Sequence, residues 1–133
     1  MSIESVIEKW HGFVHEATVE GLQELLAEDC VFLSPIVFTP QRGREITATY
    51  LYAASQTLGQ GGFTYTKQVL AGSTAVLEFE TTLEGKYVNG VDIITIDEAD
   101  HIVEFRVMVR PLQAVQLVHA QMQAMLESLA PKG

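Results

Sequence analysis

Apolar side chains recur every three or four residues in the first part of the chain, which is the spacing of amphipathic helices. A first helix is predicted by the run of Ile3, Val6, Ile7, Trp10, Phe13, Val14 and Ala17. After a break near Thr18 and Gly21, a second short helix is predicted by Leu22, Leu25 and Leu26. Residues 30–35, CVFLSP, then predict a strand that stops at Pro35, and residues 43–59 predict a third helix that ends at glycines.

Beyond the third helix the hydrophobic period changes to two, which is typical of strands with one buried face. Residues 74–85, TAVLEFETTLEG, have a predicted inner face of Ala75, Leu77, Phe79, Thr81 and Leu83. Residues 101–111 repeat the pattern, with a predicted inner face of Val103, Phe105, Val107 and Val109. Pro111 opens a last helix over about 111–129, with an apolar stripe of Val115, Val118, Met122, Met125, Leu126 and Leu129.

Helices followed by an antiparallel meander predict an α+β domain in which a curved sheet folds around helices on its inner face. We expect residues 1–133 to form one such domain, since a chain of 133 residues with 47% apolar side chains can bury one core and still enclose a cavity. The net charge of −9 argues against nucleic acid and anionic membranes as partners. The chain has a single cysteine, Cys30, and its first segment resembles neither a signal peptide nor a spanning helix. Both features indicate a cytoplasmic protein.

One carboxylate interrupts an otherwise apolar strand. Residues 90–105, GVDIITIDEADHIVEF, predict two strands joined by an acidic turn, with Asp92 near the start of the first. A two-residue turn at 98–99 would set Asp92 opposite Phe105 on the inner face, whereas a three-residue turn would set it opposite Arg106. We favour the first register because it keeps the apolar face of the last strand inside. A lone carboxylate buried there is expected to have a raised pKa.

Other candidate sites carry less chemistry. His11 and His15 lie four residues apart on the first predicted helix and could supply half of a metal site, but no third ligand accompanies them. Residues 59–63, GQGGF, lack the strand and helix that flank a phosphate-binding loop. We therefore predict neither a metal nor a cofactor.

Residues 9–35, KWHGFVHEATVEGLQELLAEDCVFLSP, and residues 91–105, VDIITIDEADHIVEF, resemble the ketosteroid isomerase and SnoaL-like polyketide cyclase branch of the nuclear transport factor 2-like superfamily. The resemblance covers most of the chain up to about Pro111. It implies a cone-shaped, cystatin-like α+β fold, in which a curved antiparallel sheet wraps around the N-terminal helices, and an apolar pocket. It also implies a homodimer that pairs through the outer face of the sheet.

The resemblance assigns roles to individual positions. The steroid isomerases place an oxyanion-binding tyrosine on the first helix, a base aspartate before the proline of the first strand, and a protonated aspartic acid on a later strand. These positions hold Trp10, Ser34 and Asp92 here, so only the neutral acid is retained. In the isomerases this acid is a known case of a carboxylic acid whose pKa is raised by an apolar site. The acid of the cyclases falls on Val107 in DHIVEFRV, and a pocket tyrosine of the isomerases falls on Tyr50.

Two classes of function follow. In the first, a small apolar metabolite binds beside Asp92, Trp10, Ser34, Tyr50, Phe105 and Val107, and Asp92 acts as a neutral acid in an isomerase, cyclase or hydratase reaction. In the second, the pocket binds its ligand without chemistry, or the chain is a dimeric scaffold. A third interpretation leaves Asp92 in a solvated turn next to Asn89 and Gly90, with no site at all.

Overall fold

The computed structural model describes residues 2–16, 19–59 and 62–129. In chain order its elements are α1 (Ile3–Glu16), α2 (Val19–Leu25), β1 (Leu26–Leu33), β2 (Gln41–Arg42), α3 (Arg44–Leu58), β3 (Thr64–Ala71), β4 (Thr74–Leu83), β5 (Lys86–Ile96), β6 (Ile102–Arg110) and α4 (Leu112–Leu129). The predicted helices and the strands β1, β4, β5 and β6 are confirmed, but Leu26, which was predicted in the second helix, begins β1, and β1 ends at Leu33 before Ser34 and Pro35. Ala17, predicted as the last apolar position of the first helix, and Thr18, at the predicted break, lie outside the described residues, as does the side chain of Leu129.

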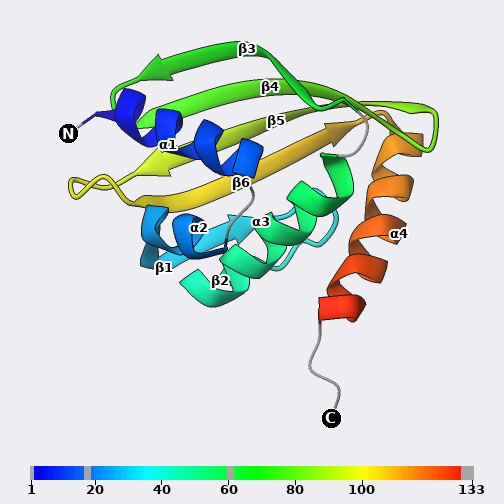
Figure 1. Cartoon of the computed structure of the whole chain (residues 1–133), viewed down its shortest axis with the longest axis horizontal. Coiled ribbons are helices and arrows are strands. Elements are labelled where there is room, and N and C mark those ends of the chain that lie inside the picture. The colour runs from blue at the N-terminus through cyan, green and yellow to red at the C-terminus, as the bar shows by residue number, and fades with distance from the viewer. Residues whose placement is uncertain (1, 17–18, 60–61, 130–133) are drawn as a thin grey trace.

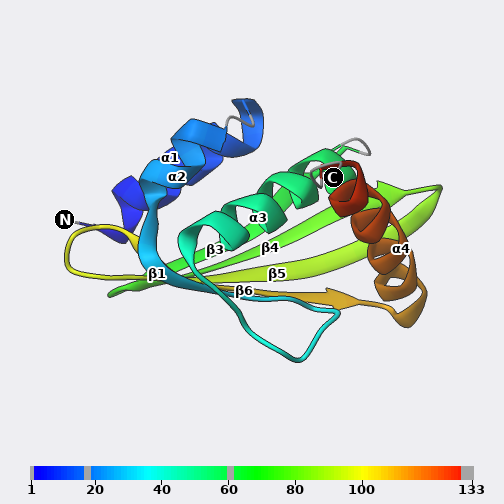
Figure 2. The same ribbon diagram turned by 90° about the horizontal axis from the view of Figure 1, so that it is seen from below.

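The strands form one six-stranded sheet in the order β2-β1-β6-β5-β4-β3. Strands β3 to β6 form an antiparallel meander, and β1 joins β6 in parallel. The helices all lie on the same face of this curved sheet (Figures 1 and 2). The predicted α+β class, with a sheet curved around helices, is therefore confirmed.

Strand β3 and the two-residue strand β2 are the elements that the hydrophobic pattern did not predict. Strand β3 pairs with β4 at the edge of the sheet, and most of its side chains are exposed on both faces. An edge strand of this kind needs no alternation of apolar and polar residues, so it has no period-two signal. Only Tyr65 and Leu70 of this strand pack against the core.

The β5–β6 hairpin differs from both registers that the sequence suggested. Asp92 pairs with Val107, because the turn spans residues 97–101 and a bulge follows Thr95. The Asp97 side chain stabilises this longer turn by accepting hydrogen bonds from backbone N–H groups. The register is two residues away from the favoured one, and an even shift keeps each side chain on its predicted face. Asp92 thus lies on the inner face, although its predicted partner was wrong.

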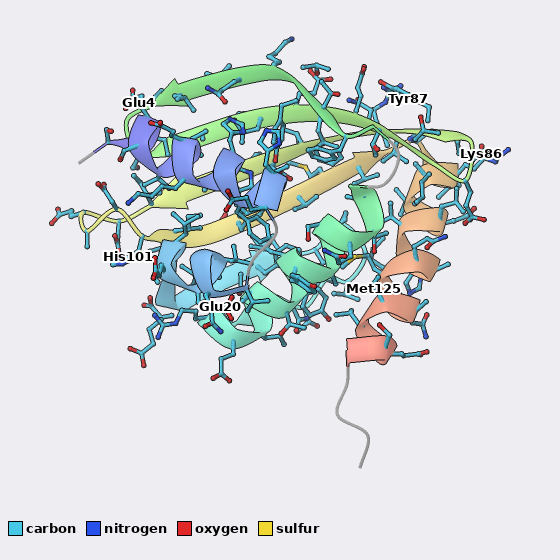
Figure 3. The ribbon with its side chains drawn as sticks, viewed as in Figure 1. Glu4, Glu20, Lys86, Tyr87, His101 and Met125 are labelled. Atoms are coloured by element: carbon cyan, nitrogen blue, oxygen red, sulfur yellow. The ribbon has the colours of Figure 1, made fainter. Side chains whose placement is uncertain are left out.

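The two ends of the sheet carry different hairpin turns. In Figure 3, His101 lies beside the β5–β6 turn, and Lys86 and Tyr87 lie at the opposite end, at the β4–β5 turn. Helix α4 begins near that second end and stands beside α3 (Figure 2). Gln121 of α4 donates a hydrogen bond of 2.7 Å to Glu84, which ties the helix to the β4–β5 turn. No helix in the described parts of the chain is long and apolar enough to cross a membrane.

Candidate ligand-binding site

A cavity of about 420 Å³ lies between the helices and the inner face of the sheet. Its walls come from α1, β1, α3, α4 and strands β3 to β6, so every layer of the fold contributes. The lining is mainly aliphatic and aromatic, and includes Trp10, Phe13, Phe32, Leu51, Phe63, Phe79, Phe105, Val107 and Val109. A mainly apolar hollow with a few polar groups is the usual form of a small-molecule site.

Asp92 is the buried polar centre of this cavity. It lies in the middle of β5, and the residue is 5% exposed. The hydroxyl of Tyr65, from β3, donates a hydrogen bond of 2.6 Å to Asp92 Oδ2. The indole Nε1 of Trp10, from α1, donates a bond of 2.8 Å to the same hydroxyl oxygen. Three elements distant in sequence thus form a directed chain of hydrogen bonds from Trp10 through Tyr65 to Asp92.

Burial without a cation raises the pKa of Asp92 from its ordinary value of 3.8 to about 7, and the bond from Tyr65 lowers this pKa by a smaller amount. The neighbouring strand supplies no counter-ion, since Arg106 contacts Glu104 at 3.3 Å and Arg110 donates to Asn89. The pKa of Tyr65 lies well above its ordinary value, mainly through burial and then through the charge of Asp92. The interpretation of Asp92 as a solvated turn residue is therefore wrong.

The direction of these hydrogen bonds decides which atom of the site can bind a ligand. The hydroxyl hydrogen of Tyr65 points to Asp92, so it is not available to another oxygen. Asp92 Oδ1 has no hydrogen bond to the described residues. When Asp92 is protonated, Oδ1 can therefore donate to a ligand oxygen in the cavity, while Tyr65 positions the carboxyl group.

The other residues predicted from the sequence also line the cavity. Ser34 Oγ accepts hydrogen bonds from the backbone N–H groups of Ile36 at 3.0 Å and Val37 at 3.4 Å, so its oxygen holds the loop after β1. The Tyr50 ring packs against Phe32, with ring centroids 5.3 Å apart. Phe105 packs 4.8 Å from the Trp10 ring, and Val107 lies directly across from Asp92.

Tyr65 and the polar side chains of α4 were missed by the sequence analysis. The aromatic residues in FTYT, before the exposed part of β3, were the only local signal for Tyr65. His11 contacts this tyrosine edge-on and hydrogen-bonds Gln68 at 2.8 Å, which gives it a partner other than a metal. Within residues 2–16, 19–59 and 62–129, no group of three His, Cys, Asp or Glu side chains is placed to hold a metal ion.

The curved sheet, the helices on its concave face and the enclosed acid define a class of small α+β pocket proteins. The SnoaL-like domain family matches residues 7–105, and the chain belongs to this family. Among solved structures, a steroid delta-isomerase from Pseudomonas aeruginosa is similar, with 30% identity, a TM-score of 0.89, and coverage of 95% of this chain and 92% of that one.

Two further structures share the fold. A conserved bacterial protein with a cystatin-like fold from Silicibacter pomeroyi has 27% identity and a TM-score of 0.85, covering 93% of this chain and 86% of that one. An NTF2-like protein of unknown function from Mesorhizobium loti has 21% identity and a TM-score of 0.70, covering 81% of this chain and 90% of that one. A comparison with the curated proteins finds no match.

Proposed function

We propose that the chain binds a small apolar molecule with one oxygen acceptor and that protonated Asp92 donates a hydrogen bond to that oxygen. The observation that carries the proposal is the buried carboxyl group, which opens on an apolar cavity and is held through one oxygen by Tyr65. Such a group polarises a carbonyl oxygen and stabilises the negative charge that develops on it. The similarity to a steroid delta-isomerase supports chemistry at such an oxygen.

The reaction classes that fit are isomerisation, ring closure and hydration, each of which needs a polarised oxygen. All of them also need a proton acceptor or a nucleophile. Ser34 lies at the position of the isomerase base, but a hydroxyl that accepts two backbone hydrogen bonds is not a base. By the resemblance to the cyclases, Val107 occupies the position of their acid. These two positions favour the second candidate function, in which the pocket binds its ligand without chemistry.

The first experiment measures the binding of 4-acetylbiphenyl, whose ketone oxygen can accept but not donate a hydrogen bond, by calorimetry as a function of pH. Its affinity for the wild type should fall as pH rises through about 7, because the donor proton on Asp92 is lost. Asp92→Leu should weaken binding by about tenfold, the value of one hydrogen bond. Glu98→Gln, an exposed change of charge in the β5–β6 turn, is the matched control and should change nothing. A pH-independent affinity that Asp92→Leu leaves unchanged contradicts the proposal.

A second measurement separates catalysis from binding. In D2O, 2-tetralone exchanges the hydrogens beside its carbonyl group, and proton NMR follows the rate. An enzyme of this type accelerates the exchange in the wild type but not in Asp92→Leu. Binding that depends on Asp92, with no acceleration of exchange, establishes the binding protein instead.

We also propose a homodimer that pairs through the outer face of the sheet. There, β4 carries Glu78 and Glu80, while β6 carries Arg106, Arg110 and the exposed Met108. A two-fold axis parallel to β5 sets the acidic strand of one subunit over the basic strand of the other, as a self-complementary interface requires.

Sedimentation velocity tests the dimer. The wild type should sediment as a dimer, and Met108→Asp should shift it to the monomer because the substitution adds an acid to the basic strand, where it would face the acidic strand of the other subunit. A monomeric wild type contradicts the dimer without affecting the cavity.

The reduced, buried thiol of Cys30 supports a cytoplasmic location, and the charge of −9 supports the absence of nucleic acid and anionic membrane partners.

A further inference from the structure

Helix α4 presents two parallel rows of side chains to the cavity. One row is apolar and consists of Val118, Met122 and Leu126. The other row is polar and consists of His119, Gln123 and Glu127. Residues four apart lie on the same face of a helix, so each row runs along the wall of the cavity. The polar row is exposed to solvent, whereas Asp92 is buried in the sheet.

This polar row offers both donors and acceptors, but its carboxylate, Glu127, can only accept. Gln123 uses its Nε2 group to donate to Glu127 Oε1 at 3.5 Å, which leaves its amide oxygen free to accept. Glu127 is a carboxylate with a second oxygen, and His119 has no hydrogen bond to the described residues. A neutral histidine offers one ring nitrogen as an acceptor and the other as a donor, so Glu127 is the group that sets the preference of the row.

The charge of the cavity has the same sign as this row. Among the described residues that line it, Asp92 and Glu127 are the acids, and no lysine or arginine is present; since Asp92 is protonated in the proposed function, Glu127 is the charge that a ligand meets. A ligand with a carboxylate, sulfate or phosphate at the exposed end would meet the like charge of Glu127 and find no lysine or arginine in the described lining. A ligand with a hydroxyl or an ammonium group would find acceptors.

We propose that the polar row of α4 recognises a second polar group of the ligand, and that this group is a hydrogen-bond donor. This inference rests on the proposed function, since it concerns the other end of the same ligand. The ligand is then an apolar molecule with an oxygen acceptor toward Asp92 and an ammonium or hydroxyl group toward Glu127. Ligands whose outer end is anionic are disfavoured.

Three 4-acetylbiphenyls that differ only at the 4′ position test this specificity: the aminomethyl, hydroxymethyl and carboxylate compounds. Their affinities, measured by calorimetry at low salt, should decrease in that order. The ammonium compound should bind about tenfold more tightly than the carboxylate, the sum of one exposed attraction and one exposed repulsion. The ratio should shrink severalfold at about 0.5 M salt, because exposed charges are screened.

Variants assign the effect to the helix. Glu127→Gln should remove most of the preference for the ammonium over the carboxylate compound and leave the affinity of the hydroxymethyl compound nearly unchanged. A purely structural role for Glu127 would weaken all three compounds equally. Glu98→Gln, which removes the same charge away from the cavity, should keep the preference intact.

The outcomes separate this inference from the function on which it rests. Equal affinities of the three compounds for the wild type, each still weakened by Asp92→Leu, overturn the role of α4 and leave the proposed function standing. A preference that survives in Glu127→Gln also overturns it. Absence of binding by all three compounds overturns both proposals together.

Discussion

Asp92 should make the stability of the protein depend on pH in a way that one substitution removes. The folded chain keeps a proton on Asp92 up to about pH 7, whereas an exposed aspartic acid releases it near 3.8. Between these values the unfolded chain binds fewer protons than the folded chain, so the free energy of unfolding falls as pH rises. Stability from this group is fully present below pH 3.8 and is lost as pH rises through about 7.

The size of the effect follows from the shift of the pKa. A rise from 3.8 to about 7 corresponds to a total loss of about 4 kcal/mol, at about 1.4 kcal/mol per pKa unit. Of this loss, about 3 kcal/mol falls between about pH 5 and about pH 8.5. Asp92→Asn has a similar shape, can still accept the bond from Tyr65, and carries no titrating group. As pH rises from about 5 to about 8.5, the free energy of unfolding of the variant should therefore increase by about 3 kcal/mol relative to that of the wild type.

Urea unfolding at the two pH values measures this difference directly. The other titrating groups are common to both proteins. The change with pH in the gap, that is, the difference in free energy of unfolding between the variant and the wild type, therefore isolates Asp92. Glu98→Gln serves as the control, and its gap from the wild type should stay constant. If the gap for Asp92→Asn is the same at both pH values, Asp92 is not a buried neutral acid, and the reasoning fails.

Three further predictions follow from the packing around the cavity. Tyr65→Phe removes the hydrogen bond that lowers the pKa of Asp92, so this pKa should rise above about 7. Carbon NMR of the carboxyl group measures the pKa, and an unchanged value would contradict the hydrogen bond. Gly90→Ala should destabilise the chain by about 1–3 kcal/mol in urea, because its Cβ would lie 2.3 Å from the Phe79 ring. Cys30 is fully buried with a raised pKa, mainly through burial, so a thiol reagent should modify it only after unfolding.

The pattern of apolar residues was sufficient for the helices, for strand β4, and for the face of the sheet on which Asp92 lies. These are local properties, because side chains in a strand alternate with a period of two, and the two-residue shift in the observed register preserved that face. The opposing residue was predicted wrongly, because the bulge after Thr95 and the five-residue turn depend on hydrogen bonds that the alternation does not encode.

The tertiary structure alone decided what surrounds the acid. Tyr65 lies 27 residues before Asp92, on an edge strand with no periodic signal, and β4 separates the two strands. Trp10 was predicted to line the site, but its role as donor to Tyr65 depends on how α1 crosses the sheet. The polar row of α4 likewise faces the cavity only because α4 stands beside α3. Contacts between segments distant in sequence arise from packing, and a one-dimensional pattern records which residues are buried but not which residues meet.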